Sequence, residues 1–173
     1  MKILIHACCA GCVHTFVDGF GDEAYDLLWY NPNIHPYTEY KARKNALVDY
    51  AKARGINVFM YDEYGLRDFV RMEALAPEKR CGNCYETRLR FAAKTAKEQG
   101  CDAFSTSLLA SPYQDFDTIC RIGNALAAEF GLEFVMHDSR QNYRKCLQEV
   151  REMGLYTQKY CGCIFSEEER YLR

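Results

Sequence analysis

The stretch from residue 115 to residue 136 reads DFDTICRIGNALAAEFGLEFVM and contains a helical pattern, a glycine and a short apolar run, in that order. Apolar and small side chains recur at helical spacing, which predicts a helix over Asp115–Phe130 with one buried face. Gly131 then supplies a helix-stop signal, because glycine readily adopts the left-handed backbone conformation that ends many helices. The apolar run Glu133–Met136 predicts a strand. This stretch therefore has the pattern of one βα repeat.

The same order of helix, glycine and strand occurs twice more along the chain. Further helices are predicted over Thr38–Arg54, Asn83–Gln99 and Tyr143–Met153, and strands over Lys2–Ile5, Tyr25–Tyr30, Asn57–Tyr61 and Asp102–Thr106. Strands that alternate with helices are typical of a parallel α/β sheet. We therefore expect a single Rossmann-like α/β domain over residues 1–173. Its mostly parallel sheet should have about five strands, with helices on both faces.

The composition describes an ordinary globular chain. Of its 173 residues 49% are hydrophobic, which is enough for a substantial core, and 27% are charged with both signs mixed, which argues against disorder. The apolar run at the start is too short for a signal peptide, and no segment approaches the roughly 20 apolar residues of a membrane span. We expect a soluble, cytoplasmic protein with no membrane partner. The net charge of −2 gives no nucleic-acid signature by itself.

Ten cysteines are the most informative feature of the composition. The cytoplasm is reducing, so disulfides are disfavoured and metal binding or redox chemistry is favoured. Seven of the ten fall in three short groups: Cys8, Cys9 and Cys12; Cys81 and Cys84; Cys161 and Cys163. The other three, Cys101, Cys120 and Cys146, are expected in the core, because free cysteine is among the most buried residue types.

Three loops of unusual composition follow predicted strands, at residues 6–12, 31–36 and 107–112. Ligands of α/β sheets bind outside the carboxyl ends of the strands, and helix N-termini face the same edge. Cys81-Gly82-Asn83-Cys84, at the start of a predicted helix, belongs to that edge too. We therefore expect a metal site at the carboxyl edge of the sheet.

The clustered cysteines are numerous enough for two metal centres. A structural zinc site or a [4Fe–4S] cluster takes four cysteines, which leaves three for a second metal ion with an open position. Adjacent cysteines at 8 and 9 should diverge and serve different centres, whereas Cys161 and Cys163 should point the same way in an extended segment. We expect the cluster on Cys9, Cys12, Cys81 and Cys84, and the second metal on Cys8, Cys161 and Cys163.

The C-terminal tail, residues 154–173, must then return the Cys-Gly-Cys pair to the site. Seven residues, Gly154–Tyr160, separate the last predicted helix from this pair. At about 3.3 Å per residue they span roughly 23 Å when extended, which suffices to cross a sheet.

Five motifs in this order resemble a known family over nearly the whole chain. They are Cys8-Cys9-Ala10-Gly11-Cys12, Tyr30–Pro36, Cys81-x-x-Cys84-Tyr85-x-x-Arg88-Leu89, Ser107–Pro112 and Tyr160–Ser166. Together they resemble the cobalamin-independent epoxyqueuosine reductase family, QueH. Gly11 departs from the Cys-Cys-Ala-Pro-Cys form of the motif, which changes a backbone constraint and removes no ligand.

The resemblance implies the last step of queuosine biosynthesis. Epoxyqueuosine at the wobble position of a tRNA with a GUN anticodon would lose its epoxide oxygen and become queuosine, in a two-electron reduction that releases water. The resemblance also implies a [4Fe–4S] cluster beside a second, mononuclear metal ion, either iron or zinc, and no cobalamin. A metal ion acting as a Lewis acid would weaken the C–O bonds, and an external low-potential donor of the ferredoxin or flavodoxin type would supply the electrons.

Candidate residues for the remaining roles lie within or near these motifs. Candidate proton donors are Tyr85, Tyr160, His35 and Asp115. Candidate partners for the cyclopentane hydroxyls are Asn33, Ser107 and Ser111, which alternatively serve as caps and turn residues. The tRNA phosphates are expected on Lys79, Arg80 and Arg88, although Arg88 could pair with Glu86 instead, and the basic Lys41–Arg54 helix is the other candidate face.

Two other functions fit parts of the pattern. A zinc-stabilised RNA-binding protein without turnover would also use the C-x-x-C spacing. An ATP-using tRNA sulfurtransferase would share the α/β fold, but it needs a phosphate-binding Ser/Gly-rich loop after the first strand. That loop is filled with cysteines here, which disfavours the sulfurtransferase.

Overall fold

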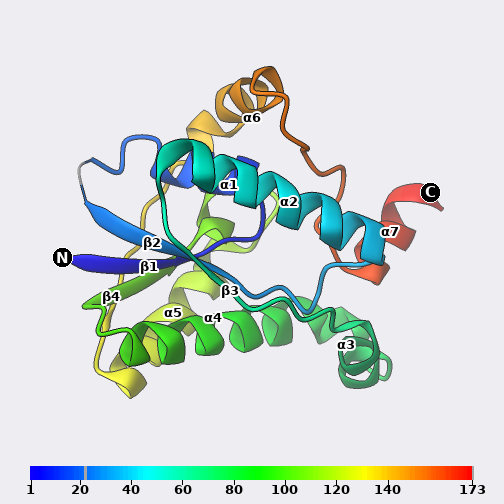
Figure 1. Ribbon diagram of the computed structural model, residues 1–173. Helices are drawn as coiled ribbons and strands as arrows, with labels where there is room; N and C mark the ends of the chain where they lie inside the picture. Colours follow the sequence, from blue (N-terminus) through cyan, green and yellow to red (C-terminus); the bar gives the residue numbers. More distant parts are fainter. Residues whose placement is uncertain (22, 173) are drawn as a thin grey trace.

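The structure is a computed structural model, and it describes residues 1–21 and 23–172. Five strands form one parallel sheet in the order β3-β2-β1-β4-β5 (Figure 1). They are β1 (Lys2–His6), β2 (Ala24–Trp29), β3 (Val58–Met60), β4 (Ala103–Thr106) and β5 (Glu133–Phe134). The predicted parallel α/β sheet of five strands is confirmed.

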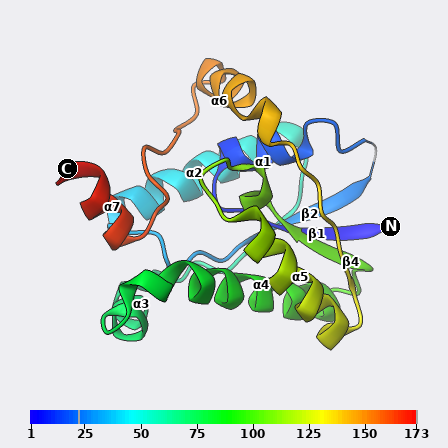
Figure 2. The same ribbon diagram turned by 180° about the vertical axis from the view of Figure 1, so that it is seen from behind.

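Helices cover both faces of this sheet, as predicted. They are α1 (Ala10–Val17), α2 (Tyr37–Arg54), α3 (Leu66–Glu73), α4 (Arg80–Glu98), α5 (Phe116–Phe130), α6 (Tyr143–Glu152) and α7 (Ile164–Tyr171), with 3-10 turns η1 (Pro77–Lys79), η2 (Ser107–Ala110) and η3 (Arg140–Asn142). Figures 1 and 2 show α1, α2 and α6 on one side of the sheet and α4 and α5 on the other. Within the described residues, no helix has the length and apolar character needed to cross a bilayer.

The central strand determines where the loops meet. Ile3, Leu4 and Ile5 of β1 are completely buried, because helices cover this strand on both sides. The carboxyl ends of β2 and β4 flank that of β1, so their loops join it through hydrogen bonds. The side-chain Nδ2 of Asn31 donates to the Ala7 carbonyl at 2.9 Å, and the backbone amide of Cys8 donates to the Ser107 hydroxyl at 3.1 Å.

Three helices were not expected from the sequence: α1, α3 and α7. Two of them start on a cysteine cap, a residue type that is not a usual N-cap. The sulfur of Cys9 accepts from the Cys12 amide at 3.1 Å at the start of α1, and the sulfur of Cys163 accepts from the Ser166 amide at 3.4 Å at the start of α7. Both helices have only eight residues, which is too short for a clear helical period.

The remaining differences lie at element ends. Helix α4 begins at Arg80 instead of Asn83, so Cys81 lies in its first turn and Cys84 begins the second. Asp115 is the N-cap of α5, where its carboxylate accepts from the Thr118 amide at 3.0 Å. Strand β5 ends at Phe134, two residues before the predicted end, because only Ala103 and Phe104 of β4 pair with it.

Candidate metal centre and its cleft

Three cysteines converge where β1 passes into α1. The sulfur atoms of Cys8, Cys9 and Cys12 all lie within 4.8 Å of one another, and all three residues are buried. The sulfurs of Cys8 and Cys9 are 3.9 Å apart, so the expectation that adjacent cysteines diverge is wrong here. Cys9 caps α1 with its own side chain, and this turns its sulfur back toward its two neighbours.

Hydrogen bonds distribute the protons unequally within this triad. Hydrogen bonding with Cys12 and Cys9 holds the pKa of Cys8 well below its usual range, and the Ser107 hydroxyl, which donates to the Cys8 sulfur at 3.3 Å, lowers it further. Burial raises the pKa of Cys9 to about 12. Hydrogen bonds to Cys8 and Cys9 raise the pKa of Cys12. Without a metal, Cys8 is therefore the residue on which a thiolate is most stable.

The other four clustered cysteines come from α4 and from the C-terminal tail. Cys84 and Cys163 are buried against Phe69, whereas Cys81 and Cys161 are exposed. Burial raises the pKa of Cys84 to about 12, Arg88 opposes this shift, and negative charge on the other three cysteines adds to it. The four thiols therefore lie within electrostatic reach of one another.

The structure thus groups the seven cysteines as three and four. Cys8, Cys9 and Cys12 form one group, and Cys81, Cys84, Cys161 and Cys163 form the other. The expected division placed Cys9 and Cys12 with the α4 pair, and Cys8 with the tail. Three further cysteines lie elsewhere, as expected. Cys101 and Cys146 are buried and Cys120 is partly exposed, and all ten cysteines have free thiols.

A buried guanidinium anchors the tail next to this site. Arg43 of α2 is 1% exposed and donates to the carbonyls of Cys161 and Tyr160 at 2.8 and 2.9 Å. Its third bond goes to the Glu39 carboxylate at 2.7 Å, whose other oxygen accepts from Tyr156 at 2.5 Å. The tail therefore binds α2 mainly through backbone carbonyls, which any tail sequence would offer.

His35 holds the same tail from the loop after β2. Its amide donates to the Gly162 carbonyl at 2.7 Å, and its Nδ1 accepts from the Ile164 amide at 3.2 Å. Its Nε2 donates to the Pro32 carbonyl, and burial lowers the pKa of the ring to about 4. The neutral ring is committed to backbone groups, so His35 is a positioning residue and the prediction that it donates a proton is not supported by this geometry.

The other candidate proton donors also have structural partners. The Tyr85 hydroxyl donates to the Gln114 side chain at 2.8 Å and accepts from the Asp115 amide. Asp115 itself is exposed and occupied in capping α5. Tyr160 lines the cleft described below, and its hydroxyl donates to the His35 carbonyl. Of the four candidates, only Tyr160 therefore borders the space where a substrate could bind.

The candidate hydroxyl-binding residues separate in the structure. Ser111 lines the cleft, whereas Ser107 is buried against Cys8. Asn33 lines a smaller hollow of about 190 Å³ beside Cys84, and its buried side-chain oxygen has no partner among the described residues. Of the three, Ser111 alone has direct access to the cleft.

The candidate phosphate-binding cations are mostly occupied. Arg88 is 2% exposed and donates to the Cys84 carbonyl at 3.2 Å, so it cannot reach an external phosphate. Its alternative partner Glu86 pairs with Arg90 instead. Arg80 pairs with Glu169 at 2.6 Å. Lys79 remains exposed on η1.

The donor set fits metal ions that prefer sulfur ligands. Soft thiolates bind zinc, iron and iron–sulfur clusters, and five of the seven clustered cysteines are buried. Arg88 gives an independent indication, because no carboxylate within the described residues pairs with this buried charge. An unpaired buried charge is costly. Negative charge on Cys84, Cys161 and Cys8 stabilises the charged form of Arg88 against the opposing effect of burial. Metal-bound thiolates at these positions would supply that charge permanently.

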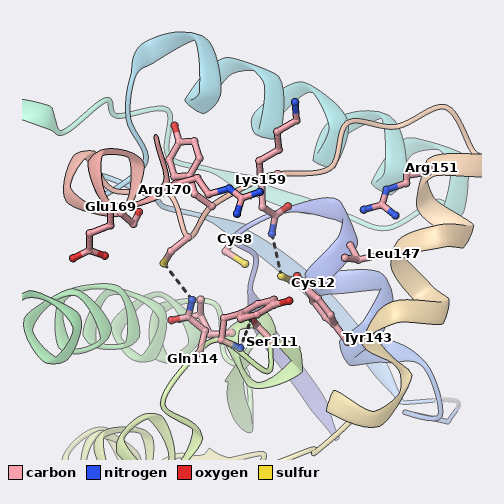
Figure 3. A pocket seen from close by; sticks show the side chains of 16 residues that line it. Cys8, Cys12, Ser111, Gln114, Tyr143, Leu147, Arg151, Lys159, Glu169 and Arg170 are labelled. Carbon is pink, nitrogen blue, oxygen red and sulfur yellow. Dashed lines mark hydrogen bonds between the residues drawn. The ribbon is translucent and has the colours of Figure 1, made fainter. Parts of the chain in front are cut away.

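Both cysteine groups open into one cleft of about 790 Å³. Cys8 and Cys12 from one group and Cys161 from the other border it. In Figure 3, Arg170, Lys159 and Arg151 lie along one side, and Ser111, Gln114 and Tyr143 lie along the other. Amide groups bind two of the sulfurs: Gln114 donates to Cys161 at 3.2 Å, and Gln158 donates to Cys12 at 3.6 Å.

Sequence reasoning missed several residues of this cleft. Gln114 follows the Ser107–Pro112 motif by two residues, and Gln158 precedes Cys161 by three, so closeness to the motifs was the available signal. Two residues of the cleft, Tyr143 and Arg151, come from α6, which is far in the sequence from any cysteine motif. Arg170 comes from α7. The packing of α6 against α1 brings Tyr143 and Arg151 to the site.

Comparison with known proteins agrees with this site. A family model described as epoxyqueuosine reductase QueH matches residues 3–169. A protein of that name from Dehalococcoides mccartyi is 35% identical over 173 residues, which cover 98% of this chain and 94% of the relative. Relatives of the same name from Thermotoga maritima and Staphylococcus epidermidis are 33% and 31% identical, over 97% and 95% of this chain and 91% and 76% of their own lengths. This chain is an oxidoreductase that belongs to the epoxyqueuosine reductase QueH family.

Proposed function

We propose that this chain reduces epoxyqueuosine to queuosine at the wobble position of tRNAs with a GUN anticodon. The epoxide takes up two electrons and two protons, both C–O bonds break, and the products are an alkene and water. The observation that carries this proposal is the cleft in which sulfurs of both cysteine groups meet the polar side chains of Ser111 and Gln114. The name shared by the relatives supports the same substrate.

The spacing of the sulfurs supports a new assignment of the metal ligands. Sulfurs bound to one tetrahedral ion through bonds of about 2.3 Å lie roughly 3.8 Å apart, and the sulfurs of Cys8, Cys9 and Cys12 are close to that spacing. We assign the mononuclear ion, iron or zinc, to these three residues. The four cysteines of α4 and the tail form no equally tight group, which suits the larger [4Fe–4S] cluster. When bound, the cluster would supply single electrons, and the mononuclear ion would act as a Lewis acid.

The side chains of the protein then bind and orient the substrate. Ser111 lies in the cleft with a hydroxyl that can bond to the cyclopentane diol. Gln114 lies opposite the tail, and Tyr85 fixes its amide by donating to the side-chain oxygen. That bond leaves the amide N–H groups of Gln114 directed toward Cys161 and the cleft. Tyr85 is therefore a positioning residue, and Tyr160, whose hydroxyl donates to the His35 carbonyl, is the one of the four candidate proton donors that lines the cleft.

The partners follow from the chemistry of this reaction. The substrate is a tRNA, which supports a cytoplasmic location. The electrons come from an external low-potential donor of the ferredoxin or flavodoxin type, and the proposed reaction uses no cobalamin. The single-stranded anticodon loop allows the modified base to turn outward into a protein cleft.

Anaerobic turnover tests the proposal directly. Reconstituted protein is incubated with epoxyqueuosine-containing tRNA and a chemical reductant, and the nucleosides are then measured by mass spectrometry. We expect queuosine, together with about five metal ions per chain and broad absorbance at about 400 nm. Cys8→Ala should abolish turnover, whereas Cys101→Ala, a buried cysteine outside both groups, should retain it. One zinc ion, no iron or sulfide and no queuosine would instead favour a zinc-stabilised RNA-binding protein.

A further inference from the structure

A second hollow continues the cleft along α6. It has a volume of about 610 Å³ and shares four residues with the cleft: Tyr113, Tyr143, Leu147 and Arg151. The two hollows therefore form one continuous groove that ends at Cys8 and Cys12. We refer to it below as the α6 groove.

Cations without acidic partners line the α6 groove. Arg144, Arg151, Lys159 and Arg170 are exposed, and no carboxylate of the described residues lies within ion-pair distance of any of them. Figure 3 shows Arg151 and Arg170 on the same side of the cleft. Among the residues that the structure describes, Glu169 is the one acidic residue that lines either hollow, and it already pairs with Arg80 at 2.6 Å. The groove therefore carries uncompensated positive charge, in a chain whose net charge is −2.

An exposed aromatic ring lies in the same groove. Tyr113 is 82% exposed and belongs to the lining of both hollows. Its ring packs edge-on against Tyr143, with centroids 6.0 Å apart, so it is supported from one side. Free cations that alternate with an exposed aromatic ring are typical of a surface for single-stranded nucleic acid, because phosphates need charge and unpaired bases need a stacking surface.

The other basic surfaces also carry exposed lysines, namely Lys41 and Lys52 of α2 and Lys79 of η1, but none of these three lines the cleft or the second hollow. On α2, Lys44 pairs with Asp62 at 2.5 Å, Arg43 is buried, and Arg54 packs over the ring of Tyr50. Near η1, Arg80 is paired with Glu169. Positive charge that is both free and adjacent to the cleft is therefore concentrated in the α6 groove.

We propose that the α6 groove binds the single-stranded anticodon loop of the tRNA. In this arrangement Arg144 and Arg151 hold phosphates flanking the modified nucleotide, and Tyr113 stacks on a neighbouring base. The modified base itself extends into the cleft toward Cys8 and Cys12. This proposal rests on the proposed function for the identity of the RNA, and it replaces Arg80 and Arg88 as the expected phosphate ligands.

Binding measured against salt tests the groove. The probe is an unmodified, fluorescently labelled tRNA transcript with a GUN anticodon, titrated with the metal-loaded protein at several salt concentrations. Each phosphate contact to a single strand contributes about −0.7 to the slope of log K against log salt. Arg144→Gln/Arg151→Gln should therefore reduce the magnitude of that slope by about 1.4 and weaken binding at low salt by at least about 10-fold. The control is Arg121→Gln, an exposed arginine of α5 outside the groove, which should bind like wild type.

The stacking contact has a different signature. Tyr113→Ala should weaken binding about 10-fold and leave the salt slope unchanged, since stacking releases no counterions. Tyr37→Ala is the matched control, because Tyr37 is a half-exposed tyrosine of α2 outside the groove. All of these side chains are exposed, and circular dichroism verifies that each variant is folded.

Several outcomes would overturn the proposal that the α6 groove binds the anticodon loop. One is an affinity and a salt slope equal to wild type in Arg144→Gln/Arg151→Gln. Another is a variant that binds tRNA normally but needs more electron-donor protein for turnover, which would assign the groove to that protein. The proposed reaction is judged separately by wild-type queuosine formation. If wild-type protein forms queuosine but the groove variants bind tRNA like wild type, only the proposal for the α6 groove is refuted. If the groove variants lose tRNA affinity as expected but wild-type protein forms no queuosine, only the proposed reaction is refuted.

Discussion

Replacing Arg43 with methionine should loosen the tail that carries Cys161 and Cys163. Arg43 is 1% exposed and uses its guanidinium for three hydrogen bonds, two of them to tail carbonyls. Methionine fills a similar volume and offers no donor. The substitution therefore removes the two hydrogen bonds from Arg43 to the tail with little loss of packing, while the bond from Tyr156 to Glu39 remains.

The expected loss can be estimated from the burial of the ion pair. Glu39 is 9% exposed, and in Arg43→Met its carboxylate keeps only the Tyr156 hydroxyl as partner. Removing one member of a buried ion pair costs about 3–5 kcal/mol, because the other charge stays buried without compensation. Adding Glu39→Gln removes that charge, so the double variant should recover about half of the loss.

Two measurements test this estimate. Urea unfolding gives the free energy of unfolding, and hydrogen exchange of the Ile164 amide reports whether the tail is bound, because this amide donates to His35. Arg90→Met is the control, since Arg90 forms exposed ion pairs with Glu86 and Glu129 that should contribute less than about 1 kcal/mol. An Arg43→Met protein that loses less than about 1 kcal/mol and retains slow exchange at Ile164 would refute the reasoning.

Two further predictions concern pH and packing. Burial lowers the pKa of His35 from 6.5 to about 4, so between these values the unfolded chain binds more protons than the native protein, and stability falls as the pH falls. Between pH 7 and pH 5 this residue should account for about 2 kcal/mol of lost stability, and a His35→Asn variant with an undiminished loss in urea unfolding would contradict it. In α5, Gly123→Ala places a methyl group 2.4 Å from the Phe134 ring and should cost about 1–3 kcal/mol. Gly82→Ala in α4 meets no atom within 4 Å and should stabilise by about 0.5–1 kcal/mol, so equal thermal shifts in the two glycine variants would be inconsistent with this packing.

The α/β fold could be predicted because its signals are local. Gly55, Gly100 and Gly131 each end or follow a helix with positive φ, and a short strand follows each of them. The apolar residues of β1 also predict that this strand is buried. Helices α1 and α7 were not predicted because their N-caps are cysteines. Their sulfurs accept backbone amide hydrogen bonds, but cysteine is not a residue type that usually indicates the start of a helix.

The candidate site was predictable in its residue types but not in its grouping. The prediction that Cys8 and Cys9 diverge rested on their being adjacent, and it is wrong because Cys9 caps α1 with its side chain and its sulfur lies 3.9 Å from that of Cys8. In the same way, the charge of Arg88 suggested a surface role, whereas its position on the buried side of α4 places it beside Cys84.

The sequence by itself determined the alternation of strands and helices, the edge of the sheet at which the loops meet, and the family to which the chain belongs. These properties depend on hydrophobic periods and motif spacing, which are local in the chain. Only the tertiary structure decided which sulfurs lie together, which cations remain unpaired, and how α6 extends the cleft. Each of these depends on contacts between residues far apart in sequence. Arg43 with Cys161 and Arg80 with Glu169 are examples, since their energies depend on a distance and a burial that no stretch of sequence encodes alone.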